Sequence, residues 1–403
     1  MTLKETAKKF MPKFLLKVYH FKLALLGAVI FGFPGLLCSR ASDGQGKSKS
    51  MKIIGVTGTS GKSTTVDLIT RILEEAGEKI ASISSIRFKV GDKEWENKYK
   101  MTMPGRFVIQ KFLRQAKNAG CKYIVLEVTS EGIRQFRHKF ISFDTAVFTN
   151  LTQEHVESHG SFENYRNEKL KLFKATKNIH VINADDRNSN YFLDIPANKK
   201  ITFGLKDAEA LGLKLKLPGE FNVYNALAAI SVAKAYGVDL QTCKKALEKA
   251  EGISGRMEVV SEGPIKVIVD YAHTPAQLEA VYKAFSGKDL VCVLGSCGGG
   301  RDKWKRPILG EIAKKYCKEV IITNEDPYDE DPMSIINQVA ETAGPNAEKI
   351  LDRKEAINTA IKIAKSGEVV IITGKGSEPW MCVENGKKIP WDDRDIVRQF
   401  LSK

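Results

Sequence analysis

The chain has 403 residues, of which 43% are hydrophobic and 28% charged, so it can bury large cores and is long enough for two or three domains. Its net charge is +15, and seven of these charges belong to residues 1–50, where nine lysines and arginines stand against two acidic residues. The remaining excess suits an anionic substrate such as a nucleotide, whereas the basic runs interleaved with aromatic residues that are typical of nucleic-acid binding are missing from the body of the sequence.

The N-terminal segment combines lysines with an apolar run. Residues 23–38 carry no charge and are mostly apolar, and Lys13, Lys17 and Lys22 precede them. The run is shorter than the roughly 20 apolar residues of a spanning helix, and it contains Pro34. Lysines ahead of an apolar face fit a helix lying on an anionic membrane surface, and the alternative is a helix packed on the body of the protein. Residues 41–50 are interpreted as a flexible linker.

A phosphate-binding loop follows. Residues 52–56 form a short β-branched run, and the segment GTSGKSTT and an apolar-periodic stretch come next. This order predicts a strand, a loop whose backbone N–H groups hold phosphate, and a helix that adds its positive N-terminus. We expect Lys62 to reach the terminal phosphates and Ser63 to bind Mg²⁺. The usual motif has glycine where Val56 stands, so the match is to a variant form, and the alternative is a bare glycine-rich turn. The ATP-binding residues expected here are Gly58, Thr59, Ser60, Gly61, Lys62, Ser63 and Thr64.

Two further strand ends carry polar side chains. The apolar run 123–128 includes Glu127, and a carboxylate at such a strand end, beside a phosphate loop, is where α/β sheets place a metal ligand. The alternative is a glutamate that caps the next helix. The run 145–150 is followed by His155 and His159, whose spacing of four could put them on one helical face, but the sequence offers too few further ligands for a zinc site.

The seven cysteines form no Cys-x-x-Cys pair and no metal-ligand spacing. An odd, scattered set predicts free thiols in a reducing cytosol. Cys297 lies in a glycine-rich loop and is interpreted as a small neutral loop residue rather than a reactive thiol.

Eight ordered segments, from about residue 51 to the C-terminus, resemble the Mur ligases, and the MurE type, which adds the third residue of the peptidoglycan stem peptide, is the most similar. The segments are GVTGTSGKSTT (55–65), LEVTSEGIRQFR (126–137), FTNLTQEHVESHGSFENYRNEKLKLF (148–173), GEFNVYNALAA (219–229), GRMEVV (255–260), VDYAHTP (269–275), GSCGGGRDKWKRP (295–307) and GKGSE (374–378). The resemblance implies an ATP-dependent ligase that activates a carboxylate acceptor, a muramyl-peptide precursor, as an acyl-phosphate and joins it to an amino acid. Two alternatives remain open: a membrane-tethered P-loop ATPase or regulator, which residues 1–64 alone would support, and a non-catalytic Mur-like subunit.

The resemblance also implies cofactors and residue roles. ATP and two Mg²⁺ ions are expected, the first ion held by Ser63 with Glu127 and the second with help from His155. Lys169 matches a lysine that family members convert with CO₂ into a carbamate, an anion able to bind metal. The catalytic residues implied are Lys62, Glu127, His155 and Lys169; further ATP contacts are Asn222, Arg256, Asp270 and His273; acceptor contacts are Thr129, Ser130, Gln135 and Arg137; and amino-acid contacts are Arg301, Glu325, Asp326, Tyr328, Gly374 and Glu378.

Three departures from the family pattern affect specificity. Residues 1–50 are too few to replace the usual uridine-binding domain, so a UDP-linked acceptor is in doubt and a lipid-linked acceptor is a hypothesis. The diaminopimelate-selecting branch carries Asp-Asn-Pro-Arg, but here Tyr328 replaces the arginine within an acidic run, 325–331, which favours a lysine-like substrate over diaminopimelate. Ser377 stands where the branch usually has histidine.

The expected fold class is α/β. We expect an N-terminal helix and linker (1–50), a P-loop mononucleotide-binding central domain with a mostly parallel sheet (51–254), and a Rossmann-like C-terminal domain (255–403). A monomeric cytoplasmic enzyme is expected, or one peripheral at the inner face of the membrane through residues 1–40. Its expected partners are a nucleotide, a peptide-type acceptor and an amino acid, without nucleic acid.

Overall fold

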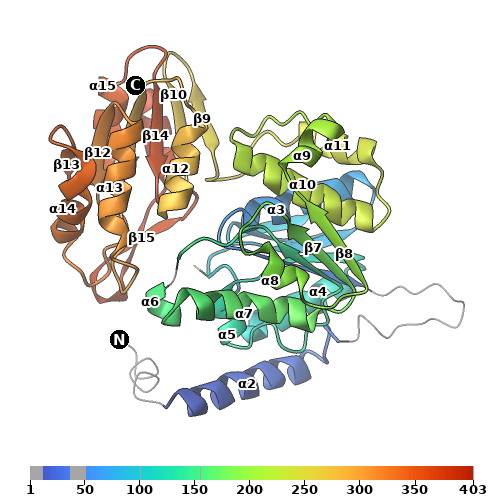
Figure 1. The fold of residues 1–403 in the computed structure, drawn as a ribbon. Helices are drawn as coiled ribbons and strands as arrows, with labels where there is room; N and C mark the ends of the chain where they lie inside the picture. The colour runs from blue at the N-terminus through green and yellow to red at the C-terminus, as the bar shows by residue number, and fades with distance from the viewer. Residues whose placement is uncertain (1–11, 37–50, 100, 155, 403) are drawn as a thin grey trace, which may run out of the picture. The chain divides into compact units, whose positions relative to one another are not determined.

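The computed structural model describes residues 12–36, 51–99, 101–154 and 156–402. The chain forms two compact units, each built around its own sheet (Figure 1). The first unit comprises Met1–Thr152, Ser161–Leu215 and Phe221–Ala250, and the second comprises Gln153–Gly160, Lys216–Glu220 and Glu251–Lys403. Two short segments that precede residue 251, Gln153–Gly160 and Lys216–Glu220, therefore belong to the second unit.

The first unit contains an eight-stranded sheet in the order β4-β3-β2-β5-β1-β6-β7-β8. The strands from β2 to β8 in this order pair in parallel, whereas β3 and β4 form an antiparallel edge. The central strands are runs of Val, Ile and Leu that are buried along their length, as parallel strands covered on both faces require. The strands are β1 (Lys52–Thr57), β2 (Ile80–Ile83), β3 (Arg87–Val90), β4 (Lys93–Glu96), β5 (Tyr123–Glu127), β6 (Thr145–Phe148), β7 (Ile179–Asn183) and β8 (Lys199–Phe203).

Helices cover both faces of this sheet. α3, α10 and α11 lie on one face, and α4, α5, α7 and α8 lie on the other (Figure 1). The helices are α3 (Lys62–Glu75), α4 (Arg106–Asn118), α5 (Ser130–Arg134), α7 (Phe162–Ala175), α8 (Ser189–Leu193), α9 (Leu205–Leu211), α10 (Glu220–Ala235) and α11 (Leu240–Glu248). An N-terminal helix, α2 (Lys13–Ile30), packs on α4.

The second unit contains a six-stranded sheet in the order β13-β12-β11-β14-β10-β9, in which only β9 is antiparallel to its neighbour among the described strands. Its strands are β9 (Glu258–Glu262), β10 (Lys266–Asp270), β11 (Leu290–Leu294), β12 (Glu319–Thr323), β13 (Glu348–Ile350) and β14 (Val369–Thr373), with a separate hairpin of β15 (Trp380–Cys382) and β16 (Lys388–Pro390) around η2 (Glu384–Gly386). Its helices are α6 (Val156–His159), α12 (Pro275–Lys283), α13 (Lys305–Tyr316), α14 (Pro332–Ala343), α15 (Arg353–Ile363) and α16 (Asp393–Leu401). The α/β class with a mostly parallel sheet and a second, Rossmann-like sheet is thus confirmed.

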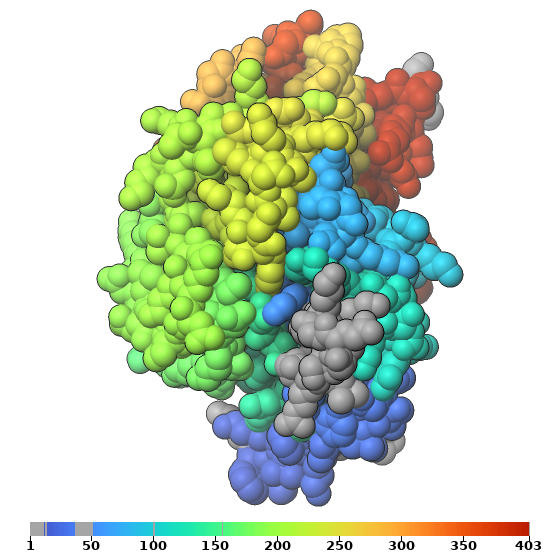
Figure 2. Space-filling model, turned by 90° about the vertical axis from the view of Figure 1, so that its right-hand side faces the viewer, coloured from blue at the N-terminus to red at the C-terminus, as the bar shows by residue number. Residues whose placement is uncertain are grey.

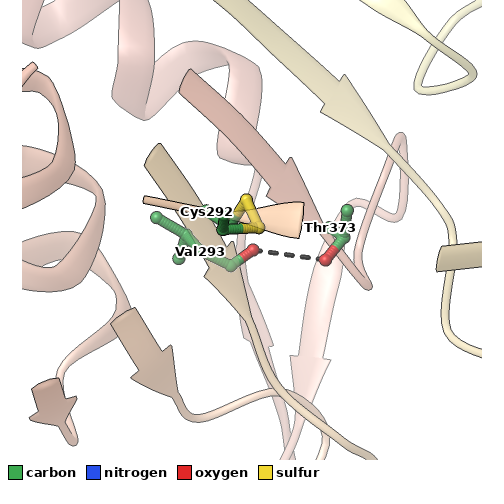
Figure 3. Close-up of a disulfide and its surroundings, with 4 residues drawn as sticks. Cys292, Val293 and Thr373 are labelled. Carbon is green, nitrogen blue, oxygen red and sulfur yellow. Dashed lines mark hydrogen bonds between the residues drawn. A yellow bond between two sulfur atoms is a disulfide. The ribbon is translucent and has the colours of Figure 1, made fainter. Parts of the chain in front are cut away.

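One prediction about the cysteines is wrong. Cys292, at the centre of β11, and Cys317, directly after α13, form a disulfide (Figure 3), whereas the sequence pattern predicted free thiols. The pairing was hidden because the two cysteines are 25 residues apart and become neighbours only when α13 packs against the sheet. Beside the disulfide, the hydroxyl of Thr373 donates to the carbonyl of Val293 across the neighbouring strands (3.2 Å). Cys121, Cys243, Cys297 and Cys382 remain thiols.

Candidate active site

The glycine-rich loop of the first unit joins β1 to the N-terminus of α3. Gly58 has φ +155°, and a Cβ on it would lie 1.9 Å from Thr149 Oγ1. Gly61, at the N-cap of α3, has φ +77°, and a Cβ there would lie 2.2 Å from Asn225 Oδ1. Both positions therefore require glycine. Because glycine has no side chain to cap α3, the first N–H groups of this helix suit an anion.

Two expected metal ligands meet beside this loop. The hydroxyl of Ser63 donates to Glu127 Oε2 (2.8 Å), and Glu127, at the end of β5, is 3% exposed. The backbone N–H of Ser85 also donates to this carboxylate oxygen (2.9 Å). A hydroxyl and a carboxylate are hard oxygen donors, which is the chemistry that Mg²⁺ prefers. These residues therefore fit a magnesium ion.

Lys62 is the first residue of α3, directly after the same loop. Its Nζ donates to the carbonyl of Thr59 (2.8 Å) and lies 3.9 Å from Glu127 Oε1. Thr59 and Ser60 are in turn held by Asn150, whose carbonyl accepts from the N–H of Thr59 (2.9 Å) and whose Oδ1 accepts from the N–H of Ser60 (2.9 Å). The structure thus brings the expected phosphate-binding residues together around the first turn of α3, which also contains the buried Thr64.

Lys169, on α7, is only 1% exposed. Its Nζ donates to the carbonyl of Gly58 (2.7 Å) and lies 4.5 Å from the ring centre of Tyr165. Among the described residues, no carboxylate lies within salt-bridge distance of this nitrogen. Burial and then the positive charge of Lys62 lower the pKa of Lys169 well below its usual value, and Glu127 offsets this only in part. A neutral amine is the form that reacts with CO₂, so the surroundings of Lys169 fit a carbamate.

The expected acceptor contacts lie in and after α5, next to the end of β5. Thr129 caps α5 by accepting from the N–H of Gly132 (3.1 Å), and Ser130 is buried behind it. Arg137 donates to Gln135 Oε1 (2.8 Å) and to the carbonyl of Met103. Burial lowers the pKa of Arg137. These polar groups form one cluster on a single short segment.

Asn222 is the expected nucleotide contact on α10. Its Oδ1 accepts from Asn225 Nδ2 (3.2 Å), and Asn225 Oδ1 accepts from the hydroxyl of Thr65 on α3 (3.3 Å). Asn225 therefore lies directly beside Gly61 and the phosphate loop, and it links Asn222 to them.

In the second unit, Asp270 ends β10 and His273 follows it. The buried carboxylate of Asp270 accepts from the N–H groups of Met257 (2.7 Å) and Ala272 (2.6 Å), and burial raises its pKa. His273 Nδ1 lies 2.9 Å from the carbonyl of Tyr271, and burial lowers the pKa of His273 well below its usual value. A neutral imidazole that donates through Nδ1 presents an unprotonated Nε2.

Arg256 and Arg301 supply positive charge to the second unit. The guanidinium of Arg256 lies 4.1 Å from the ring centre of Tyr271, and Arg301 is exposed. The next residue, Asp302, is buried and accepts from the N–H of Glu157 (3.1 Å), which belongs to the segment that the second unit takes from the first half of the chain.

The same segment contains Glu154, which sequence reasoning missed. Glu154 is 4% exposed and pairs with the buried Lys305 (3.5 Å), and burial raises the pKa of Glu154. Lys305 also donates to the carbonyl of His273 (2.9 Å). The predicted metal ligand His155, next in the chain, lies outside the described residues. The pair of Glu154 and Lys305 gave no signal in the sequence because the two residues are about 150 positions apart.

Cations of the second unit pair with two of the five acids in the run 325–331. Asp326 accepts from Lys375 (2.9 Å) and from the N–H of Cys382 (2.7 Å), and Glu330 forms a two-oxygen pair with the buried Arg306 (2.7 and 3.0 Å). Asp331 caps α14 and Asp329 accepts from the N–H of Asn385 (2.7 Å). Cations therefore compensate part of the acidic run, and Glu325 is a buried acid outside these ion pairs.

Glu325 is 2% exposed, and only one of its oxygens is engaged. Oε1 accepts from the thiol of Cys297 (2.8 Å), whereas the buried Oε2 has no hydrogen-bond partner among the described residues. A Cβ on Gly374 would lie 2.4 Å from this oxygen, so only glycine fits beside it. Burial raises the pKa of both Glu325 and Cys297, which keeps the Cys297 thiol protonated.

Two other residues expected to bind the amino acid, Glu378 and Tyr328, contact side chains of the second unit. Glu378 accepts from Tyr271 (3.1 Å) and from Lys375 (2.6 Å). Tyr328 has φ +52°, and a Cβ on Gly299 would lie 2.6 Å from its ring, so the glycine-rich loop 298–300 is needed for close packing against it. Lys375, which sequence reasoning did not select, is fully buried between Asp326 and Glu378.

Known proteins share both halves of this arrangement. Residues 56–211 match the Mur ligase middle domain, and residues 255–376 match the Mur ligase, glutamate ligase domain. The chain is 38% identical to the UDP-N-acetylmuramoyl-L-alanyl-D-glutamate–2,6-diaminopimelate ligase of Syntrophomonas wolfei, covering 94% of this chain and 81% of that protein. It is 36% identical to the UDP-N-acetylmuramyl-tripeptide synthetase of a Roseiflexus species, covering 94% and 82%.

Solved structures agree with the sequence comparison. A UDP-N-acetylmuramoyl-L-alanyl-D-glutamate–2,6-diaminopimelate ligase structure superposes with a TM-score of 0.59 at 30% identity, covering 87% of this chain and 78% of that one. The folylpolyglutamate synthase of Mycobacterium tuberculosis, solved with ADP, superposes with a TM-score of 0.67 at 18% identity over 88% and 91%, a likeness of fold alone.

Proposed function

The chain belongs to the Mur ligase family, and from this premise we infer that it is an ATP-dependent ligase that forms a peptide bond in a peptidoglycan precursor. The observation that carries the residue assignment is the cluster of Lys62, Ser63, Glu127 and Lys169 around one phosphate loop. We further propose that the enzyme works in the cytoplasm as a monomer, with residues 1–50, 51–254 and 255–403 as its N-terminal segment, central domain and C-terminal domain.

The first step joins a carboxylate oxygen of the acceptor to the γ-phosphorus of ATP, and the bond from that phosphorus to ADP breaks. Lys62 neutralises the terminal phosphates, and the N–H groups at the start of α3 hold them. Ser63 and Glu127 would hold Mg²⁺, which withdraws charge from the phosphate oxygens when bound. Gln135 and Arg137 hold the acceptor, with Thr129 and Ser130 beside them.

The second step joins the amine nitrogen of the incoming amino acid to the acyl carbon, and phosphate leaves with the oxygen that it shared with the acceptor. The nitrogen loses a proton in this step. In the second unit, Arg301 is an exposed cation suited to the amino acid's carboxylate, and Arg256 and the neutral His273 are assigned to ATP.

We propose that Lys169 works as a carbamate, which with His155 and Glu127 would complete the metal ligands. The support is its burial, its lowered pKa and the lack of a paired carboxylate among the described residues. Carbon NMR with labelled bicarbonate tests this. A carbamate resonance present in the wild type and missing from Lys169→Met is expected, and identical spectra would refute the assignment.

The ligase itself is tested by ADP release across a panel of amino acids, with the dipeptide acceptor in UDP-linked and lipid-linked forms. Release that requires both acceptor and one amino acid is expected. Release that ignores both would favour a nucleotide-switch ATPase instead.

We propose a lysine-like amine as the substrate, in contrast to the diaminopimelate in the names of several relatives. Tyr328 stands where the diaminopimelate-selecting pattern has arginine, and the buried Oε2 of Glu325, which has no hydrogen-bond partner among the described residues, suits an ammonium. Tyr328→Arg should raise kcat/KM for diaminopimelate, and Glu325→Gln should lower kcat/KM for lysine by about 10–100-fold through loss of a charged hydrogen bond. A wild-type enzyme that prefers diaminopimelate over lysine would overturn the proposal.

A further inference from the structure

Helix α2 exposes its large apolar side chains, whereas an ordinary surface helix buries them. Its inner face, which is buried against the first unit, consists of small or polar residues: His20, Ala24, Gly27 and Ala28. Its outer face consists of exposed large apolar side chains, and Phe14, Val29 and Ile30 are 72%, 53% and 58% exposed. The outer face comprises Phe14, Leu15, Leu25, Leu26, Val29 and Ile30. A surface helix normally buries such residues, so a face of this kind marks a binding surface.

Specific contacts fix the inner face to the first unit. Gly27 lies against the start of α4, where a Cβ built on it would be in ordinary van der Waals contact (3.6 Å) with the backbone of Arg106. Arg106 hydrogen-bonds to His20, and Arg114 donates to the carbonyl of Phe31 at the end of α2 (2.8 Å). Because these contacts hold one side of the helix, its large apolar side chains are left exposed on the other side. In the space-filling view, α2 lies at the surface in dark blue at the bottom of the picture (Figure 2).

Arg106 and α2 also contact the segment that carries the residues assigned to acceptor binding. Arg106 donates from Nε (2.9 Å) and Nη2 (2.6 Å) to the carbonyl of Gln135. Phe136, between Gln135 and Arg137, has φ +58° and packs its ring against Phe21 of α2, with ring centres 6.1 Å apart. The segment that carries Gln135 and Arg137 is therefore supported from the inner side of α2.

The positive charge around α2 indicates which kind of surface its outer face would bind. Residues 1–22 contain six lysines against the single acid Glu5, whereas residues 23–36 contain no charged residue. Lys17 and Lys22 lie exposed on α2 itself. Lysines beside an apolar helix face match the headgroups and the acyl boundary of an anionic bilayer. Within the described residues, no helix is long and apolar enough to cross a membrane, so contact would be along the surface.

We propose that the outer face of α2 docks on the anionic surface of a lipid bilayer and thereby holds the acceptor-binding segment of the ligase at the membrane. The link between docking and the acceptor rests on the function proposed above, and it points to an acceptor that is presented by the membrane. The docking itself rests on the geometry and charge of α2 alone.

Flotation of the full chain with vesicles tests the docking. The wild type should bind vesicles of phosphatidylglycerol and phosphatidylcholine and bind phosphatidylcholine alone weakly. Val29→Glu/Ile30→Glu should lower partitioning at least about tenfold, because two apolar side chains no longer enter the lipid. Lys17→Ala/Lys22→Ala should lower it by roughly fivefold per lysine, and added salt should remove that difference.

The matched control is Leu351→Glu/Ile389→Glu, which adds the same charges at apolar positions of similar exposure, 46% and 43%, in the second unit. It should bind like the wild type. Wild-type protein that fails to float with anionic vesicles, or α2 variants that float equally well, would overturn the docking. A wild-type dimer that Val29→Glu/Ile30→Glu converts to monomer, without vesicle binding, would assign the face to a second copy instead. ADP release with a soluble acceptor reports on the ligase separately, so failure of either proposal is recognised by itself.

Discussion

Lys169 in the first unit and Lys375 in the second are both almost completely buried, at 1% and 0% exposure, but their surroundings differ. Lys375 lies between the carboxylates of Asp326 (2.9 Å) and Glu378 (2.6 Å). Lys169 has a carbonyl and an aromatic ring as its closest partners, and Lys62 adds a second positive charge. A buried ammonium with paired carboxylates is stable as an ion, whereas one without them tends to lose its proton. Lys375 is therefore expected to stabilise the second unit as an ion, whereas Lys169 is expected to react as a neutral amine.

The largest expected effect is on the paired lysine. Lys375→Met leaves two carboxylates uncompensated inside the second unit and should lower its free energy of unfolding by about 3–5 kcal/mol. Urea denaturation measures this. The control is Lys362→Met, at an exposed position on α15, where a change within about 0.5 kcal/mol is expected. A Lys375→Met protein as stable as the wild type would show that the ion pairs are not structural.

Lys169 should affect activity instead. Lys169→Ala should lower the rate of ADP release by about 10²–10³-fold, as expected for the loss of a charged group that stabilises the transferring phosphate. Lys169→Arg should be as inactive, because arginine keeps a positive charge but cannot form the carbamate. The control Lys171→Ala, at an exposed neighbour on α7 that pairs with Glu168, should keep full activity. An active Lys169→Arg variant would mean that a cation, and no carbamate, is required.

The smallest expected effect is on pH dependence. Without bicarbonate, the native amine of Lys169 has lost its proton at pH values where the unfolded lysine, with a pKa near 10.5, still carries one. Between the lowered pKa and about 10.5 the unfolded state therefore binds more protons, and stability rises with pH by up to about 1.4 kcal/mol per pH unit. Unfolding free energies of the wild type and Lys169→Met, measured across this range, should diverge in that direction. Parallel curves would show that Lys169 is charged in the native protein.

The sequence predicted the fold class because alternating buried strands and helices leave a strong periodic pattern. It also selected Lys62, Ser63 and Glu127, since each stands in a motif whose local geometry brings it to the phosphate loop. Lys169 could be selected only through the family resemblance, because a helix lysine carries no local sign that it will be buried.

The long-range partners could not be predicted. Lys375 stands in a glycine-rich loop and finds Asp326 only through the packing of β14 beside β11 and of β11 beside β12. The acidic run 325–331 was predicted to be a repulsive loop, but Arg306 pairs with Glu330 and Lys375 with Asp326, so cations compensate part of its charge. His155 stays a prediction, since it lies outside the described residues.

The disulfide between Cys292 and Cys317 makes the stability of the second unit depend on whether the protein has been kept reduced or oxidised. Cys317 closes the C-terminal end of α13, and the N-terminal end of that helix carries Lys305 and Arg306, which hold His273 and Glu330. A cross-link over 25 residues is worth about 3 kcal/mol. Protein kept in reductant and protein exposed to air are therefore two molecules of identical sequence, and the second unit of the reduced one should open more readily at the helix that supports these contacts.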